Sequence, residues 1–476
     1  MKQRKWQVLA VTSVAVFMSF LDVTIVNIAF PDVRASFAGT SLAGLSWILT
    51  AYNIVFAALL VPAGRLADRV GRRRTFLAGL VVFLAASAAA GLAPTVAVLV
   101  VARVVQAAGA AALVPTSLAL LLPEFPLAQR ATATGIWGAT GAVAAAVGPS
   151  LGGVLVDVAG WRWVFFVNLV IGLAALVPAR RLLLERREAT PGPMPDAVGV
   201  VLLIAGVALL SLGIVEGQDW GWAGGRVLGA LGAGVVLLLA FAARSARHPS
   251  PVVDPALFRV RSFSVSIAGI FAFALAFYAF LLANVLFLTG PWHYSVLEAG
   301  FALTPGPLMA AVGAPVGGRL ADRFGQRVVA LPGGVLFGIG CLGMAASTGP
   351  TPAWASEVLP WLFLTGFGVG LSFSAWGSAA VAELPPSRFA TGGAISGCLR
   401  QIGAVLGIAI LVAVIGPPDP GDPVGPFHDA WRLMAVAGLA AGALALALGR
   451  VRARDPEAVA PPLPEAAAVP TPAVVN

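Results

Sequence analysis

Two charged side chains lie inside long apolar stretches of the sequence. Asp22 comes about eight residues before the end of the stretch 8–30, and Arg103 about eight residues after the start of 95–122. In helices that run in opposite directions, both would lie about 12 Å below the same surface. Arginine stays charged and needs an acceptor when it is buried. We therefore expect Arg103 to pair with Asp22, the one acid that the stretches clearly offer at that depth.

Such a pair has the properties needed to move protons. Burial favours the neutral form of a carboxyl group, whereas a neighbouring guanidinium favours its charged form. A change in helix packing or a bound molecule can tip this balance and release or capture a proton. Ionisable groups inside a membrane usually mark ion or substrate pathways. We interpret Asp22 and Arg103 as a proton-coupling pair, and the alternative is a static ion pair that locks two helices together.

Arg400 is the third charge inside an apolar stretch, and no acid lies in its own stretch. It could hold an anionic group in a cavity or pair with a backbone end, and the sequence favours neither. Polar and aromatic residues at similar depths are candidates to line a substrate cavity, although aromatic residues in such stretches more often pack or face lipid. The candidates are Asn27, Trp47, Tyr52, Gln106, Trp137, Phe273, Phe277, Tyr278, Trp376, Arg400 and Gln401.

The elements that must position these residues are membrane-spanning helices. The chain has 476 residues, of which 59% are apolar and 11% charged, and its mean hydropathy is +0.92. Soluble globular proteins have about 45–50% apolar and about 25% charged residues, so a soluble enzyme and a disordered chain are both excluded. Stretches long enough to span a bilayer occur at 8–30, 44–63, 76–93, 95–122, 131–157, 163–179, 198–216, 226–243, 263–288, 296–316, 328–347, 354–381, 390–415 and 430–449. The predicted fold is therefore an all-α integral membrane protein with 14 transmembrane helices.

The basic residues predict the orientation of these helices. An even number of spans places both termini on one side. With that side taken as the cytoplasm, 24 Lys and Arg residues fall in cytoplasmic segments, 4 in outer loops and 2 within spans. Cytoplasmic loops of membrane proteins carry this excess of positive charge. The net charge of +9 is thus assigned to topology, not to nucleic-acid binding.

An internal repeat divides the chain. Residues 64–71 (GRLADRVG) recur as 318–325 (GRLADRFG) with one difference. We infer two related six-helix halves, 8–180 and 263–449, and an inserted helix pair, 198–243. The remaining segments are a cytoplasmic N-terminus (1–7), two cytoplasmic loops (181–197 and 244–262) and a disordered cytoplasmic tail (450–476). Transporters built from internal repeats bind substrate between the repeats, near the middle of the membrane.

Two glycine-containing motifs are expected to shape the movement of the halves. The repeated motif is interpreted as a cytoplasmic loop in which glycines allow a tight turn and Asp68 caps a neighbouring helix. Such a loop would hold the two halves together in one conformational state of transport. The alternative is a basic loop that only sets the topology. Its residues are Gly64, Arg65, Asp68, Arg69, Gly71, Arg72, Gly318, Asp322, Arg323 and Gly325. Residues 148–153 (GPSLGG) predict a bend with close packing, at Gly148, Pro149, Gly152 and Gly153.

Five segments together resemble a known family. Residues 21–31 (LDVTIVNIAFP), 64–74, 103–109 (RVVQAAG), 148–153 and 161–168 (WRWVFFVN) are similar, in order, to motifs of the 14-helix drug:proton antiporters, a branch of the major facilitator superfamily. This resemblance spans nearly the whole chain. It implies alternating access, proton exchange and export of organic compounds. Two positions depart from the family pattern: Ala144, where a glycine is common, and Gln326, which makes the second loop motif less basic.

The expected function is therefore proton-coupled export of amphipathic small molecules such as drugs, antibiotics or dyes. An alternative is proton-coupled uptake of a small organic solute. A membrane enzyme is disfavoured because His248, His293 and His428 lie in predicted loops without a catalytic or metal-ligating cluster. No ATP-binding loop of the G-x-x-x-x-G-K type occurs.

The remaining expectations concern partners and substrate. The expected partners are a small-molecule substrate, protons and the lipid bilayer of the cell membrane, with no cofactor, metal or nucleic acid, and the expected state is a monomer. One membrane-embedded acid suits a monocationic, neutral or zwitterionic substrate better than a dication. Export of a specific antibiotic and broad multidrug export are equally compatible with the sequence.

Overall fold

The computed structural model describes residues 2–187, 193, 196–384, 388–416 and 421–448, and these residues form helices and short connections. Fourteen helical spans in this part of the chain are long and apolar enough to cross a membrane, as predicted. Twelve are single helices: α1 (Lys2–Ser36), α2 (Leu42–Val70), α3 (Arg72–Gly91), α4 (Val96–Leu121), α5 (Leu127–Ala159), α6 (Trp163–Leu182), α7 (Ala197–Val215), α9 (Gly225–Ser245), α10 (Arg261–Thr289), α13 (Arg327–Ser347), α16 (Phe389–Ile415) and α17 (Gly425–Leu444).

The other two spans are each made of two helical pieces. The short α11 (Val296–Leu303) precedes α12 (Pro305–Phe324), and the single turn α14 (Trp354–Glu357) precedes α15 (Leu359–Ala382). Pro305 stands at the first position of α12, where a missing backbone N–H costs nothing. Pro149, by contrast, lies inside an unbroken α5.

The helices extend further than the apolar stretches. α1 begins at Lys2, so most of the predicted N-terminal segment 1–7 is helical. α2 continues to Val70, so residues 64–69 are the last turns of a helix and not a loop. The backbone can keep its helical hydrogen bonds into the polar surface of a membrane, whereas hydropathy marks only the apolar part. The turn is confined to Gly71, whose φ of 125° is open to glycine and strained for other residues.

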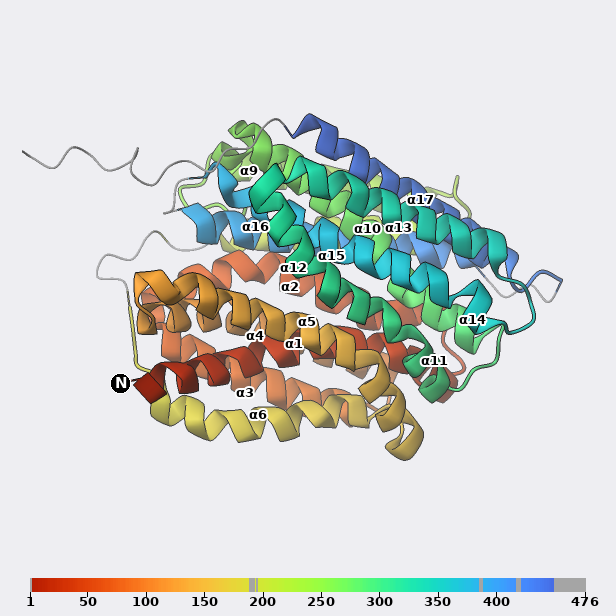
Figure 1. The fold of residues 1–476 in the computed structure, drawn as a ribbon. Coiled ribbons are helices and arrows are strands. Elements are labelled where there is room, and N and C mark those ends of the chain that lie inside the picture. Colours follow the sequence, from red (N-terminus) through yellow and green to blue (C-terminus); the bar gives the residue numbers. More distant parts are fainter. Residues whose placement is uncertain (1, 188–192, 194–195, 385–387, 417–420, 449–476) are drawn as a thin grey trace, which may run out of the picture.

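Two groups of helices make up the molecule. In Figure 1, α1–α6 form the lower group and most of α10–α17 lie above them, with α11 reaching down to the level of the lower group, where it packs on α5. They meet along two seams: α2 packs against α16, and α5 packs against α11 and α12. The inserted helices α7 and α9 pack on each other, and α7 also contacts both α2 and α16. A cluster of buried apolar residues, including Ala58, Leu203 and Val405, joins these three helices.

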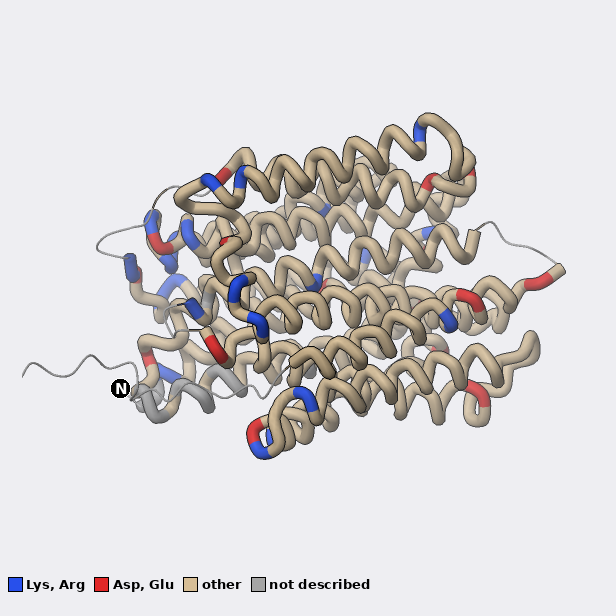
Figure 2. The backbone as a smooth tube through the Cα atoms, turned by 90° about the horizontal axis from the view of Figure 1, so that it is seen from above, with Lys and Arg blue, Asp and Glu red and all other residues tan. Residues whose placement is uncertain are grey.

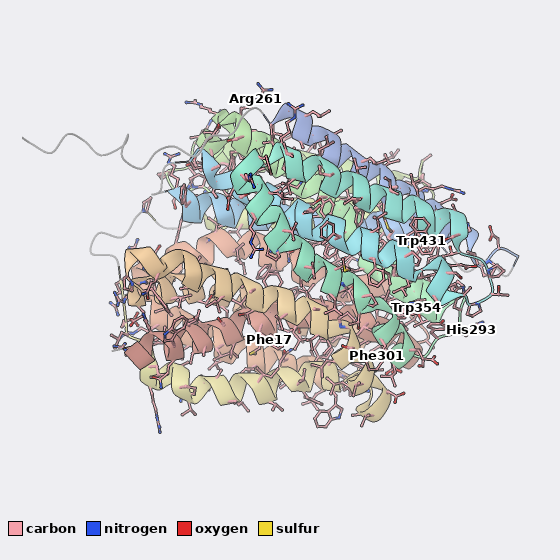
Figure 3. The ribbon with its side chains drawn as sticks, viewed as in Figure 1. Phe17, Arg261, His293, Phe301, Trp354 and Trp431 are labelled. Carbon is pink, nitrogen blue, oxygen red and sulfur yellow. The ribbon has the colours of Figure 1, made fainter. Side chains whose placement is uncertain are left out.

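The two ends of the bundle differ in charge. Figure 2 shows Lys and Arg gathered at the end where the N-terminus lies. We call this the basic end and the opposite one the far end. In Figure 3, Arg261 lies toward the basic end, and Trp354 and His293 lie at the far end. The predicted tail 450–476 and parts of the segment 181–197 lie outside the described residues.

Candidate functional site

Asp22 and Arg103 form a buried ion pair, as their shared depth predicts. An Nη1 atom of Arg103 lies 2.5 Å from Oδ2 of Asp22. The side chain of Asp22 is 0% exposed and that of Arg103 is 1% exposed. α1 and α4 run in opposite directions through the same half, which brings the two residues to one level. A buried guanidinium in this setting has the acceptor that its charge requires.

Three further side chains complete a polar network around this pair. The Nε2 atom of Gln106 donates to Oδ1 of Asp22 (2.8 Å) and to the hydroxyl of Ser87 (2.7 Å). The Nδ2 atom of Asn168 also donates to Oδ1 of Asp22, at 3.1 Å. All three side chains are fully buried. We use the term polar network for Asp22, Ser87, Arg103, Gln106 and Asn168.

Arg103 ties the polar network to a fifth helix. It donates from Nη1 to Oε1 of Gln106 (2.6 Å) and from Nε to the carbonyl of Ile48 on α2 (3.2 Å). Its guanidinium also lies 4.0 Å from the centre of the Tyr52 ring, a cation–π distance. The polar network therefore joins α1, α2, α3, α4 and α6, and it lies within one half of the molecule.

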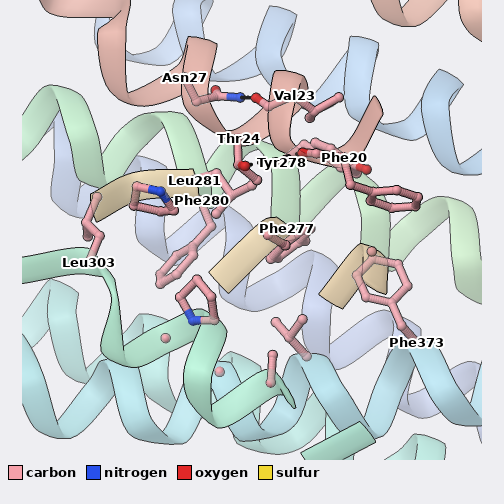
Figure 4. Close-up of a pocket in the computed structure, with 18 of the residues that line it drawn as sticks. Phe20, Val23, Thr24, Asn27, Phe277, Tyr278, Phe280, Leu281, Leu303 and Phe373 are labelled. Carbon is pink, nitrogen blue, oxygen red and sulfur yellow. Dashed lines mark hydrogen bonds between the residues drawn. The ribbon is translucent and has the colours of Figure 1, made fainter. Parts of the chain in front are cut away.

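A cavity of about 350 Å³ lies between the two halves. Its walls come from α1, α2 and α5 on one side and from α10, α11, α12, α15 and α16 on the other. Figure 4 shows Phe20, Phe277, Phe373, Leu281 and Leu303 around it. Volumes of this size and largely apolar walls are typical of small-molecule sites.

Six of the predicted cavity residues line this space, namely Asn27, Tyr52, Phe277, Tyr278, Arg400 and Gln401. The other candidates lie elsewhere. Gln106 belongs to the polar network, and Trp47 packs where α2 meets α7 and α16. The indole of Trp137 donates to Ser117 on α4 (3.0 Å).

Phe273 and Trp376 are fully buried among the helices of the second half. Depth along a span can be counted from sequence, but the direction in which a side chain points around the helix depends on packing. For this reason the sequence could not show whether these two aromatic residues line the cavity or pack between helices.

The cavity carries one charged group among the described residues that line it, and that group is Arg400. Asp22 faces away, into the polar network. This corrects the expectation that the membrane-embedded acid would set the charge preference for substrate. Gln401 of α16 donates to Asn53 of α2 at 3.1 Å and accepts from the hydroxyl of Tyr278 at 3.3 Å, so one amide connects the two halves beside the cavity.

The repeated motif has a different geometry from the one predicted. Among the described residues Asp68 does not cap a helix: its Oδ1 accepts from Nε of Arg72 across the Gly71 turn (2.8 Å), and Nη2 of Arg72 also lies 2.8 Å from Oδ1. The cap on α3 is Glu185, whose carboxylate accepts from the backbone N–H groups of Arg73 (3.1 Å) and Arg74 (3.2 Å). Nothing in the sequence marked Glu185, because its partner helix lies 111 residues away.

The other motif residues are placed as follows. Arg65 donates to Ser250 in the segment before α10 (2.5 Å), and a Cβ on Gly64 would lie 3.5 Å from Pro115 of α4. Arg69, Asp322 and Arg323 are exposed, and Gly318 is helical. Gly325 repeats the positive φ of Gly71, at 91°.

The residues of 148–153 act as close contacts. Gly148 packs against Thr24 and Gly152 against Ile28, both on α1. A Cβ on Gly153 would lie 3.0 Å from the Cα atom of Leu297 on α11. The absence of side chains here lets α5 approach α1 on one side and α11 across the seam on the other.

A helical membrane protein with a cavity between two halves has the architecture of a small-molecule transporter. Consistent with this, residues 12–198 and 266–475 match the family described as Major Facilitator Superfamily. The chain belongs to this family.

Relatives cover most of the chain. It is 36% identical over 408 residues to the multidrug resistance protein Stp of Mycobacterium tuberculosis (86% of this chain, 75% of that protein). It is 34% identical over 441 residues to the tetracenomycin C resistance and export protein of Streptomyces glaucescens (90% and 79%). A solved POT family transporter in complex with 5-aminolevulinic acid has the same fold, with a TM-score of 0.68 at 16% identity over 92% of this chain and 94% of that one.

Proposed function

We propose that this protein exports amphipathic small molecules of the drug or antibiotic class in exchange for protons, by alternating access. The observation that carries the proposal is a buried, fully hydrogen-bonded carboxylate on a helix that also lines the central cavity. The names of the relatives, which describe multidrug resistance and tetracenomycin C resistance and export, support this substrate class.

Helix α1 is the element that can couple the two events. Asp22 points into the polar network, whereas its neighbours Val23 and Thr24 line the cavity. A proton on Asp22 would remove the charge that holds Arg103 and so loosen α1 from α4. A molecule in the cavity presses on the opposite face of the same helix. Each event thus changes the free energy of the other, as coupled transport requires.

The proposal includes secondary active transport by a monomer in the cell membrane, with both termini in the cytoplasm. The concentration of Lys and Arg at the basic end, where the N-terminus lies, supports this orientation. No resident cofactor or metal is part of the proposal.

The test uses purified protein in liposomes with an imposed pH gradient and a panel of dyes and antibiotics. We expect substrate to move against the proton flow and a protonophore to abolish the movement. Movement of substrate together with protons would overturn export and support uptake instead.

A further inference from the structure

Arg400 is partly buried and, unlike the fully buried Arg103, forms no hydrogen bond or ion pair with the described residues. It lies on α16 and lines the cavity. Its Nε atom is buried and forms no hydrogen bond, and the described part of the chain offers its guanidinium no carboxylate. The guanidinium lies over the ring of Phe20 on α1, with its carbon atom 5.7 Å from the ring centre.

The lack of an acceptor for the buried Nε atom of Arg400 costs free energy. A charged group in an apolar environment is stable only when it is paired or hydrogen-bonded. Arg103 meets that requirement with Asp22, Gln106 and the carbonyl of Ile48. Arg400 does not, although it lies at mid-span in a helix of the same protein. A guanidinium that lines a cavity and whose buried Nε atom lacks an acceptor points to a ligand as the source of that acceptor.

The surroundings indicate what else the ligand carries. Phe277 and Phe373 meet edge to face, with ring centres 5.4 Å apart, and line the same cavity. Asn27 also lines it, and its buried Oδ1 atom has no hydrogen-bond partner in the described part of the chain. Aromatic walls suit a flat apolar body, and a free carbonyl oxygen suits a hydroxyl donor.

We propose that Arg400 binds an acidic oxygen of the substrate, a carboxylate or an ionised phenol, so that the cavity selects aromatic acids over lipophilic cations. The inference rests on the proposed function and names its substrate class. Guanidinium binds carboxylate through parallel, charge-assisted hydrogen bonds. A cation in the same cavity would meet like charge from Arg400, and the described residues that line the cavity include no acid to offset it.

The test is equilibrium binding of three probes with one ring system to purified protein in detergent. The probes are 9-anthracenecarboxylate, 9-anthracenemethanol and 9-anthracenylmethylammonium, followed by their fluorescence. Wild-type protein is expected to bind the carboxylate at least about tenfold more tightly than the ammonium compound. Arg400→Met should weaken carboxylate binding by about 10- to 100-fold and leave the alcohol unchanged, because it removes only a charge-assisted contact.

Three further variants sharpen the result. Arg400→Lys should retain part of the carboxylate affinity, since the charge remains without the planar fork. Gln401→Glu should weaken carboxylate binding by placing an acid next to Arg400. Arg432→Met removes an exposed arginine that pairs with Asp429 and should change nothing.

Binding separates this inference from the proposed function, because no proton gradient is present. Equal affinity of wild-type protein for the carboxylate and the ammonium probe would overturn it, as would no carboxylate binding. Equal losses of carboxylate and alcohol in Arg400→Met would show a damaged cavity and also overturn it. Failure of proton-coupled export with intact carboxylate selectivity would count against the proposed function alone.

Discussion

At the scale of single residues, the proposed proton coupling depends on the position of Asp22. Its carboxylate accepts hydrogen bonds from Arg103, Gln106 and Asn168, and its side chain is fully buried. In the proposed function, a proton bound to this carboxylate would displace a donor. The polar network would then link proton binding to the packing of five helices.

Asp22→Asn is expected to abolish proton-coupled export while the protein still folds. The amide cannot release a proton, but it can keep hydrogen bonds to its neighbours. Removing one partner of a buried ion pair costs about 3–5 kcal/mol, and we expect a smaller loss here because Arg103 keeps Gln106 and the Ile48 carbonyl as acceptors. The measurement is substrate-driven proton movement in liposomes, with thermal unfolding as the check on folding.

The matched control is Asp32→Asn on the same helix. Asp32 accepts from the backbone N–H of Trp161 (3.2 Å) and lies outside the polar network and the cavity. This variant should exchange protons as the wild type does. Full coupling in the Asp22 variant would remove that residue from the proton path.

The sequence predicts a contact between two residues where their depth in the membrane alone decides it. Asp22 and Arg103 were paired by counting, since an apolar stretch gives a charge few choices. Asn168 ends the 161–168 motif, but nothing indicated that it or Ser87 contacts the ion pair. Small polar residues are common in spans, and the partners of Asn168 and Ser87 lie 146 and 19 residues away in the chain, respectively. Trp376 points into its own half for reasons of packing that a sequence pattern does not contain.

At the scale of elements, the turn between α2 and α3 is held by three features. Gly71 adopts a positive φ, Asp68 pairs with Arg72, and Glu185 caps α3. A Cβ on Gly71 would lie 2.5 Å from Oε1 of Glu185. The turn and its cap therefore leave no room for a side chain.

Gly71→Ala is expected to destabilise the protein more than Gly325→Ala. Both substitutions place a side chain at positive φ, which costs about 1–3 kcal/mol. At Gly325 a Cβ would meet nothing within 4 Å, whereas at Gly71 it would displace the Glu185 carboxylate. The melting temperatures of the two variants measure the difference. Equal shifts would contradict the role assigned to Glu185.

The start of α7 offers a test that depends on pH. Burial acts to raise the pKa of Asp196, but hydrogen bonds from the backbone of Gly199 and from Arg244 outweigh it, and the net pKa is lowered. A lowered pKa in the folded state stabilises the protein above the usual value of about 4 and loses this effect as the pH falls through the folded value. Asp196 caps α7 and connects it to Arg244 near the end of α9.

Asp196→Ala is expected to lower stability by about 0.5–2 kcal/mol at pH 7, the usual cost of losing a helix cap. The difference from wild type should shrink as the pH falls below about 4. Asp196→Asn keeps a capping oxygen, so its stability should lie between that of the wild type and that of Asp196→Ala. Thermal unfolding between pH 3 and 7 gives the comparison, and a difference that does not vary with pH would exclude a role for the charge.

Elements were predicted well in number and less well at their ends. Each apolar stretch corresponds to one span, because a bilayer sets a minimum length. The ends depend on caps such as Glu185 and on glycines such as Gly71, whose partners come from other parts of the chain. The span that contains Pro305 is divided into α11 and α12, and α11 packs on α5, where Gly300 lies against the carbonyl of Pro149.

At the scale of the whole molecule, the basic end predicts the orientation in the membrane. A cysteine placed in the segment 181–197 should react with a membrane-impermeant reagent only when the cytoplasmic face is accessible. Cys341 and Cys398 are buried and free, so the unmodified protein provides a low background. Labelling of that segment in intact cells would reverse the proposed topology.

The overall division into halves could be inferred from the repeat of eight residues, since a repeated segment indicates a repeated unit. The seams between the halves could not. They depend on small residues such as Gly153 and Gly300 and on the amide of Gln401, and no local pattern shows which helix lies opposite.

The position of α7 has a consequence for how oily molecules approach. It covers the seam between α2 and α16, and no helix of the described chain covers the seam between α5 and α12, where Val143 and Val312 are 51% and 52% exposed. The two sides of the protein thus present unequal walls to the bilayer. A compound dissolved in the lipid leaflet would meet two layers of helices at the seam of α2 and α16, and one layer at the seam of α5 and α12. We therefore expect lateral entry from the membrane to be one-sided, along the seam where α5 and α12 meet.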